Sequence, residues 1–180
     1  YTVIINTSGI DRTFLHCTGA NDTFDAADVD LEALTGVQIL HFGYPSLMRT
    51  MALHDGAAST ILMRRVKEQG ITTSLDMSMP DPSSEAGRVD WRRMLANTLP
   101  FVDLFCPSID EIRFMLRRPI PPESDTVSVD ELEAIAAELL AMGAAVVMLK
   151  LGNRGLFLRT TADAIRLAAC GAWRPIEPHR

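Results

Sequence analysis

The chain has 180 residues, of which 47% are hydrophobic and 22% are charged. This length suits about one domain, and this composition argues against a disordered, coiled-coil or collagen-like chain. The 17 basic and 23 acidic residues leave a net charge of −6, so we expect neither nucleic acid nor an anionic membrane surface as a partner.

The first 35 residues are predicted to form an appended β-hairpin. Two short apolar runs, at residues 2–6 and 12–17, flank the turn sequence Ser8-Gly9-Ile10-Asp11. A glycine-containing turn between two such runs is typical of antiparallel strands. Because the chain opens within a predicted strand, we expect it to be a piece of a longer protein.

From residue 36 onward, short β-branched runs alternate with longer runs of helical periodicity. This order is typical of βαβ units with a mainly parallel sheet. The predicted strands cover residues 37–42, 72–77, 102–106 and 145–151. The predicted helices cover residues 56–69, 90–99, 109–116 and 129–142. The sequence Gly152-Asn153-Arg154-Gly155 predicts a tight turn, followed by one more strand that ends near residue 160.

The cysteines indicate the cellular compartment. Cys17, Cys106 and Cys170 lie far apart and form no Cys-x-x-Cys pair. They indicate neither a disulfide framework nor a zinc cluster, and a reducing cytoplasm fits them best. The longest uncharged apolar stretch, residues 139–149, is too short to cross a bilayer.

Polar residues follow the predicted parallel strands, where open α/β sheets bind their ligands. Tyr44, Asp76, Glu111 and Lys150 stand at or just after four strand ends. Carboxylates with a lysine suit an anionic ligand and a divalent metal. The sequence lacks the usual patterns of P-loop proteins, dinucleotide-binding folds, serine hydrolases and zinc proteases.

Four segments together resemble the middle of a pfkB (ribokinase-like) carbohydrate kinase. They are His41-Phe42-Gly43-Tyr44-Pro45, the Ser-Leu-Asp-Met-Ser-Met-Pro-Asp-Pro of residues 74–82, the Val-Asp-Leu-Phe-Cys-Pro-Ser-Ile-Asp-Glu of residues 102–111, and the Leu-Lys-Leu-Gly-Asn-Arg-Gly of residues 149–155. The resemblance implies an α/β fold with three αβα layers. Its middle layer is a doubly wound, mainly parallel sheet. Residues 36–180 would be a partial nucleotide-binding core. Residues 1–35 would be part of a small β lid, through which a homodimer could form.

The resemblance also implies a function, the ATP-dependent transfer of a phosphoryl group to a sugar or nucleoside-like hydroxyl with Mg²⁺. Glu111 matches the metal-binding glutamate of the family's Asn-x-x-Glu, whereas Ser108 replaces the asparagine. The resemblance also assigns roles to the other matching positions. Contacts to the nucleotide phosphates are expected from Ser108, Lys150, Gly152 and Gly155. Contacts to the substrate are expected from Tyr44, Asn21 and Asp76. A second departure is Ser78, which stands where the family commonly has asparagine after Asp76.

No catalytic residue is assigned. The sequence Gly19-Ala20-Asn21-Asp22 resembles the family's Gly-Ala-Gly-Asp signature, but it precedes the Gly152–Gly155 turn, whereas the signature follows that turn. Because short motifs out of context usually carry no function, Asp22 is not taken as the catalytic base. We therefore expect the isolated 180 residues to be inactive.

Simpler interpretations stay open for the same residues. Ser108 and Glu111 have the spacing of a helix capping box, the two glycines can serve a hairpin alone, and Lys150 can extend along apolar surface toward water. The whole chain could also be a kinase-derived pseudoenzyme. A receiver-like signalling module with Asp76 as phospho-acceptor is another alternative, although it needs an acidic pair after the first parallel strand that this sequence lacks.

Overall fold

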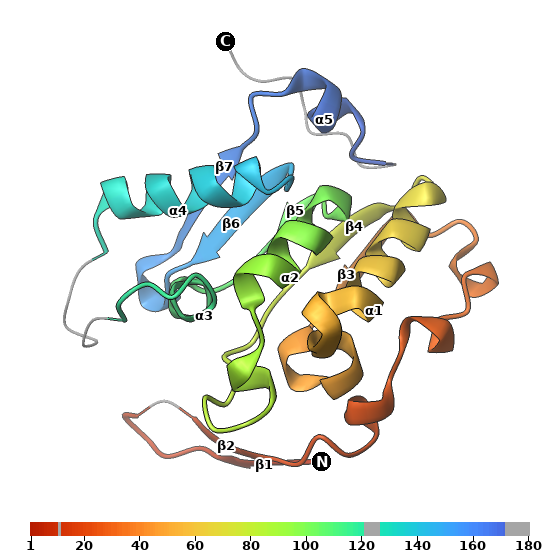
Figure 1. Ribbon diagram of the computed structural model, residues 1–180. Helices are drawn as coiled ribbons and strands as arrows, with labels where there is room; N and C mark the ends of the chain where they lie inside the picture. Colours follow the sequence, from red (N-terminus) through yellow and green to blue (C-terminus); the bar gives the residue numbers. More distant parts are fainter. Residues whose placement is uncertain (11, 121–126, 172–180) are drawn as a thin grey trace.

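The computed structural model describes residues 1–10, 12–120 and 127–171, and its main feature is a five-stranded mixed sheet (Figure 1). The strands are β3 (Ile39–Phe42), β4 (Thr72–Leu75), β5 (Leu104–Phe105), β6 (Val146–Lys150) and β7 (Leu156–Thr160). They lie in sequence order; β3 to β6 are parallel, and β7 pairs with β6 in the antiparallel direction. A separate antiparallel pair is formed by β1 (Thr2–Ile5) and β2 (Thr13–His16). The predicted α/β fold with an appended small sheet is confirmed.

Helices connect the parallel strands. They are α1 (Arg49–Glu68), α2 (Trp91–Thr98), α3 (Ile109–Met115) and α4 (Val129–Ala141), and α5 (Ala164–Ala168) follows the last strand. Strands that follow one another across a sheet through right-handed connections place their helices on the same face. Figure 1 shows α1, α2 and α4 side by side across one face of the sheet.

The alternation of side chains in β6 divides the core between the two faces of the sheet. Val147 and Leu149 belong to the main core cluster beneath the helices, whereas Val146 and Met148 belong to a smaller cluster. Leu167 of α5 packs in that smaller cluster, so α5 lies on the opposite face and supplies the third layer.

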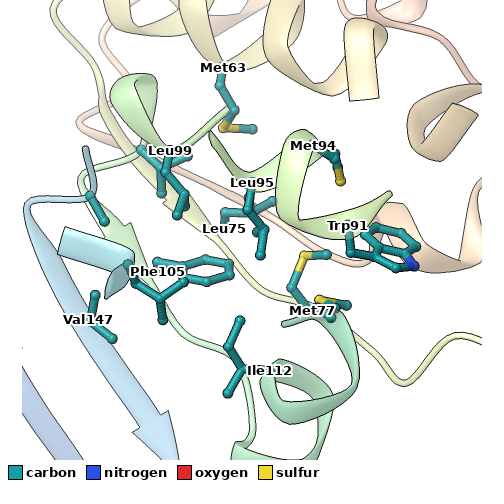
Figure 2. Packing of buried hydrophobic residues seen from close by; sticks show 14 of the residues in the cluster. Met63, Leu75, Met77, Trp91, Met94, Leu95, Leu99, Phe105, Ile112 and Val147 are labelled. Carbon is teal, nitrogen blue, oxygen red and sulfur yellow. The ribbon is translucent and has the colours of Figure 1, made fainter. Parts of the chain in front are cut away.

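The main core fills the space between the sheet and its helices. Figure 2 shows Leu75 and Phe105 of the strands facing Met63 of α1 and Leu95 of α2, and all four side chains are fully buried. Burying a side chain of this size stabilises the fold by about 1.5–3 kcal/mol. Because β3 to β6 are parallel, their carboxyl ends lie at one edge of the sheet.

Helix α1 begins earlier than predicted and contains a break. The predicted helix started at residue 56, but α1 starts at Arg49, and the backbone leaves helical geometry from Leu53 to Gly56. His54, Asp55 and Gly56 have positive φ angles of 54°, 55° and 71°. Such angles are rare outside glycine, so the local sequence predicts no turn of helix before Gly56.

Other differences concern element ends. The predicted strand at residues 102–106 is reduced to β5, although Cys106 N still donates to Leu75 O at 2.9 Å and Asp103 N to Thr73 O at 3.1 Å. Strand ends often differ by one or two residues in this way.

Helix α5 was not predicted. Asp11 of the predicted hairpin turn and residues 172–180 of the predicted core lie outside the described residues. No helix in the described ranges combines the length and the hydrophobicity that a membrane span requires.

Candidate functional site

An ion pair joins two strand ends at the carboxyl edge of the sheet. Asp76 follows β4, and Lys150 ends β6, two strands away. Lys150 Nζ lies 2.6 Å from Asp76 Oδ1 and 2.7 Å from Oδ2, and Met77 N donates to Oδ1 at 2.7 Å. The Asp76 carboxylate is largely buried, whereas 44% of the Lys150 side chain is exposed. The ammonium group is therefore held in place by Asp76, on a side chain that remains partly exposed.

The start of α3 lies directly beside Lys150. Ser108 forms a parallel bridge with Lys150, and Lys150 N donates to Pro107 O at 2.9 Å. Ser108 N donates to Glu111 Oε2 at 2.7 Å, and Glu111 N donates to Ser108 Oγ at 3.3 Å. The capping box that the spacing allowed is thus present. Glu111 Oε1 accepts no hydrogen bond from the described residues, so capping leaves one carboxylate oxygen available.

The electrostatics of Glu111 reflect both neighbours. Burial raises the pKa of the Glu111 carboxyl, and the charge of Asp76 adds to this rise. The hydrogen bond from the Ser108 backbone and the positive charge of Lys150 act in the opposite direction. Glu111, Asp76 and Lys150 therefore form one electrostatic group at a single edge of the sheet.

The glycine turn follows Lys150. Gly152 and Gly155 have φ angles of 63° and 90°, in the region that favours glycine, and Gly155 N donates to Gly152 O at 3.2 Å. A Cβ atom at either position would meet no heavy atom within 4 Å. The hairpin turn is thus confirmed, and its open surface lies next to the ion pair. Contact of these glycines with phosphate stays a prediction.

The two remaining predicted substrate residues come from other segments. Tyr44 follows β3 and is 43% exposed. The preceding Gly43 lies beside Asp76, because a Cβ atom added at Gly43 would be 3.5 Å from Asp76 Cβ. Asn21 is exposed in the short 3₁₀ helix Gly19–Thr23. No hydrogen bond joins Asn21 to the strand-end residues within the described chain. Their roles in binding substrate stay predictions.

Asp22 has local partners. Thr18 Oγ1 donates to Asp22 Oδ2 at 2.5 Å, and Thr50 Oγ1 donates to the Asp22 carbonyl at 2.8 Å. The second bond fastens the Gly19–Thr23 helix to the start of α1, which follows the carboxyl end of β3. The segment that leaves the small β1–β2 sheet is therefore attached at the same edge of the main sheet as the ion pair.

Two residues of this edge were missed in the sequence. Cys106 follows β5 directly and is buried. Burial raises the pKa of its thiol, and the charge of Asp76 adds to this rise. A hydrogen bond with Ser74 and the positive charge of Lys150 lower the pKa. Ser46 Oγ accepts a hydrogen bond from Ser78 N at 3.0 Å. The position of Cys106 directly after a predicted parallel strand is the sequence signal that could have placed it at this edge.

The donor set suits a metal that is shared with a nucleotide. In the described part of the chain, no group of three His, Cys, Asp or Glu side chains is arranged to hold a metal ion. Mg²⁺ in nucleotide sites commonly uses only one or two carboxylates and completes its shell with water and phosphate oxygens. Glu111, with Asp76 in the same electrostatic group, fits this pattern.

Comparison with solved structures shows the same fold. A PfkB protein from Polaromonas sp. JS666 is 21% identical with a TM-score of 0.60, and 88% of this chain covers 49% of that one. A ribokinase from Arabidopsis thaliana, solved with ribose and ATP, is 18% identical with a TM-score of 0.60 and covers 90% and 45% of the two chains. A ribokinase from Giardia lamblia is 17% identical with a TM-score of 0.61, with coverage of 89% and 44%. The chain thus spans about half the length of these structures.

No curated protein sequence matches the chain. The family model described as "pfkB family carbohydrate kinase" matches residues 1–172, nearly the whole sequence. This match agrees with the fold and with the order of the four segments at the strand ends. The chain belongs to the pfkB family of carbohydrate kinases.

Proposed function

We propose that the chain supplies the nucleotide and metal side of an ATP-dependent carbohydrate kinase, which transfers the γ-phosphoryl group to a sugar or nucleoside-like hydroxyl. The observation that supports this most directly is the convergence of Asp76, Glu111 and Lys150 at one edge of the sheet. Family membership makes phosphoryl transfer to a sugar the first reaction to test. The receiver-like alternative has no support from that membership.

In this proposal each residue at the edge has a distinct task. The Lys150 ammonium binds a phosphate oxygen, and Asp76 keeps it oriented. Glu111 holds Mg²⁺ through its open oxygen, directly or through water. Mg²⁺, when bound, neutralises charge on the phosphates. The Ser108 hydroxyl and the backbone at Gly152 and Gly155 provide further polar contacts to the phosphates.

The sugar lies on the other side of the transferred phosphoryl group. Tyr44, beside Asp76, and Asn21, on the segment that follows the small sheet, contact the sugar. Asp76 lies between the nucleotide side and the sugar side of the site. Its carboxylate binds Lys150, and the residue itself lies next to Gly43, which precedes Tyr44. The small sheet covers the sugar and excludes water.

We further propose that the 180 residues alone bind Mg·ATP but transfer no phosphoryl group. The sequence holds no Gly-Ala-Gly-Asp, and Asp22 is already bonded to Thr18. Phosphorylation of any sugar above the level of an Asp22→Ala control would refute this statement.

Calorimetric titration with Mg·ATP tests the binding. Lys150→Gln should weaken the affinity about tenfold, because a hydrogen bond to a charged group contributes roughly 1.5–3 kcal/mol. Arg159→Gln is the matched control, since this side chain is about as exposed and lies on the neighbouring β7, in an ion pair with Glu133. Equal affinities for the parent and Lys150→Gln would contradict the role of Lys150. An absence of binding heat at millimolar nucleotide would favour the pseudoenzyme, an outcome that the serines at positions 78 and 108 permit.

We also propose a homodimer that forms through the small sheet. Both faces of the β1–β2 pair carry exposed apolar side chains, with Val3 and Leu15 on one face and Ile4 and Phe14 on the other. A two-stranded sheet is marginally stable by itself, and a second copy would bury these side chains. Sedimentation velocity of the parent and Ile4→Lys tests this; a dimer that persists unchanged in the variant would contradict it.

A cytoplasmic location is consistent with the thiols. Cys17, Cys106 and Cys170 are all free. Unpaired cysteines are typical of a reducing compartment.

A further inference from the structure

A cavity lies apart from the strand-end site. It has a volume of about 410 Å³ and is formed by the segment before α2 and by the end of α3. This volume is in the range of cavities that bind small organic molecules. Asp76, Ser108, Glu111 and Lys150 are not among the residues that line it.

The floor of this cavity is apolar. Trp91 and Met115 are 3% and 1% exposed, and Phe114 lies half-buried beside them. Trp91 Nε1 donates to Ala86 O at 2.8 Å, so the one polar atom of the indole is already satisfied within the chain. The accessible apolar surface therefore comes mainly from Phe114 and from Ile120, which is 47% exposed, while Trp91 and Met115 lie beneath them.

The rim of the cavity is basic. Arg88, Arg117 and Arg118 all line it, and we call it the arginine cavity. Arg118 is neutralised in part by Glu138, at 2.7 Å, but Arg92 shares the same carboxylate at 2.5 Å. Among the described residues, Arg88 and Arg117 have no ion-pair partner. Positive charge thus exceeds negative charge here, in a chain whose net charge is −6.

The backbone gives no reason for an arginine at position 117. Arg117 N donates to Phe114 O at 3.0 Å, and Arg118 N donates to Arg113 O at 2.8 Å. These two bonds form a Schellman motif, whose left-handed position usually carries glycine. Arg117 occupies it with φ 56°. Residues held in such an unfavourable backbone conformation cluster at functional sites, and Arg117 lines the cavity.

We propose that the arginine cavity binds a small organic anion that has a flat apolar group, such as an aromatic phosphate. The ring packs against Phe114 and Ile120, and the phosphate accepts hydrogen bonds from Arg88 and Arg117. Arginine suits this task because its planar group donates two parallel hydrogen bonds to a phosphate. Neither the family match nor the strand-end site requires such a ligand.

Titration with 1-naphthyl phosphate, followed by its fluorescence and by calorimetry, tests the proposal. The parent should bind the probe saturably, and the neutral 1-naphthol about tenfold more weakly. Arg117→Gly should weaken the phosphate about tenfold without loss of stability, because glycine relieves the positive φ. Arg88→Gln should have a similar effect. Arg64→Gln, an exposed arginine in an i,i+4 pair on α1, and Lys150→Gln should both leave binding unchanged.

Several results would overturn the proposal. One is an unchanged affinity in an Arg88→Gln Arg117→Gly double variant that has the urea midpoint of the parent or a higher one. Another is equal binding of 1-naphthol and 1-naphthyl phosphate. A loss of binding in Lys150→Gln would assign the probe to the strand-end site instead, and no saturable binding by the parent would remove the ligand class altogether.

Discussion

Replacing Asp103 by asparagine should lower the free energy of unfolding by about 3 kcal/mol, through loss of a buried counter-ion. The Asp103 side chain is fully buried, and it accepts hydrogen bonds from Lys67 Nζ at 2.5 Å, a guanidinium nitrogen of Arg166 at 2.8 Å and Thr73 N at 3.0 Å. These partners join the end of α1, strand β4 and helix α5 at the amino edge of the sheet.

The magnitude follows from what the variant leaves behind. Removing one partner of a buried ion pair typically costs about 3–5 kcal/mol. Lys67 and Arg166 are each 17% exposed, and each keeps a carbonyl acceptor, Ala169 O for the lysine and Gly143 O for the arginine. These acceptors place the expected loss at the lower end of that range. Asparagine is nearly isosteric with aspartate, so no cavity contributes.

Urea unfolding of the parent, Asp103→Asn, Lys67→Met and the double variant measures the effect. Lys67→Met alone should destabilise the protein less, because Arg166 still neutralises Asp103. The double variant should be more stable than the sum of the single losses predicts. A loss below about 1 kcal/mol in Asp103→Asn, with an unchanged m-value, would refute this reasoning.

Three further predictions concern the cysteines, Glu111 and Gly56. In the folded protein at pH 8, iodoacetamide should modify the exposed Cys17 and spare Cys106 and Cys170, since burial raises the pKa of both thiols, that of Cys170 to about 11; rapid modification of all three would contradict this. Glu111→Gln keeps the capping bond, and the folded-state pKa of Glu111 is above its ordinary 4.5, so the glutamate is progressively less favourable as the pH rises through that raised pKa. The stability of the variant relative to the parent should therefore increase over that pH range in urea unfolding, while the Mg²⁺ dependence of ATP binding is lost; the opposite pH trend would contradict the sign. Gly56→Ala should destabilise by about 2–3 kcal/mol, because φ is 71° and the new methyl group would lie 2.2 Å from a side-chain carbon of α2; a thermal midpoint equal to that of the parent would contradict it.

The fold was predictable where local signals agreed. The apolar spacing of residues 129–142 predicted α4 to within one residue at its end. Ser128 Oγ caps the helix by accepting from Glu131 N, whereas the Glu131 carboxylate accepts from Arg113 and does not complete a capping box. The first turn of α1 was not predictable, because His54 and Asp55 adopt positive φ values that only tertiary packing enforces. Helix α5 has five residues, too few for a periodic pattern, and its Arg166 finds Asp103 across 63 residues.

The sequence predicted the location of the candidate site better than the contacts between its side chains. Because parallel strands end at one edge, their topology alone brings Asp76 close to Lys150, which lies 74 residues further along the chain. That the two would form a direct ion pair depends on side-chain geometry, which no local pattern reports. Likewise, Ser108 and Glu111 fit both capping and metal binding by spacing, and the structure shows the capping bonds while leaving Glu111 Oε1 open.

The sequence offers an unusually direct test of the strand-end site, because Lys67 and Lys150 are its only lysines and they lie at opposite edges of the sheet. An adenosine phosphopyridoxal, whose aldehyde occupies the place of the terminal phosphate of ATP, can be fixed on a nearby lysine by borohydride and located by peptide mass spectrometry. We expect pyridoxyl label on Lys150, prevented by excess Mg·ATP, with Lys67 unlabelled. Label on Lys67 or on the terminal amine alone, or label on Lys150 that Mg·ATP does not reduce, would contradict it.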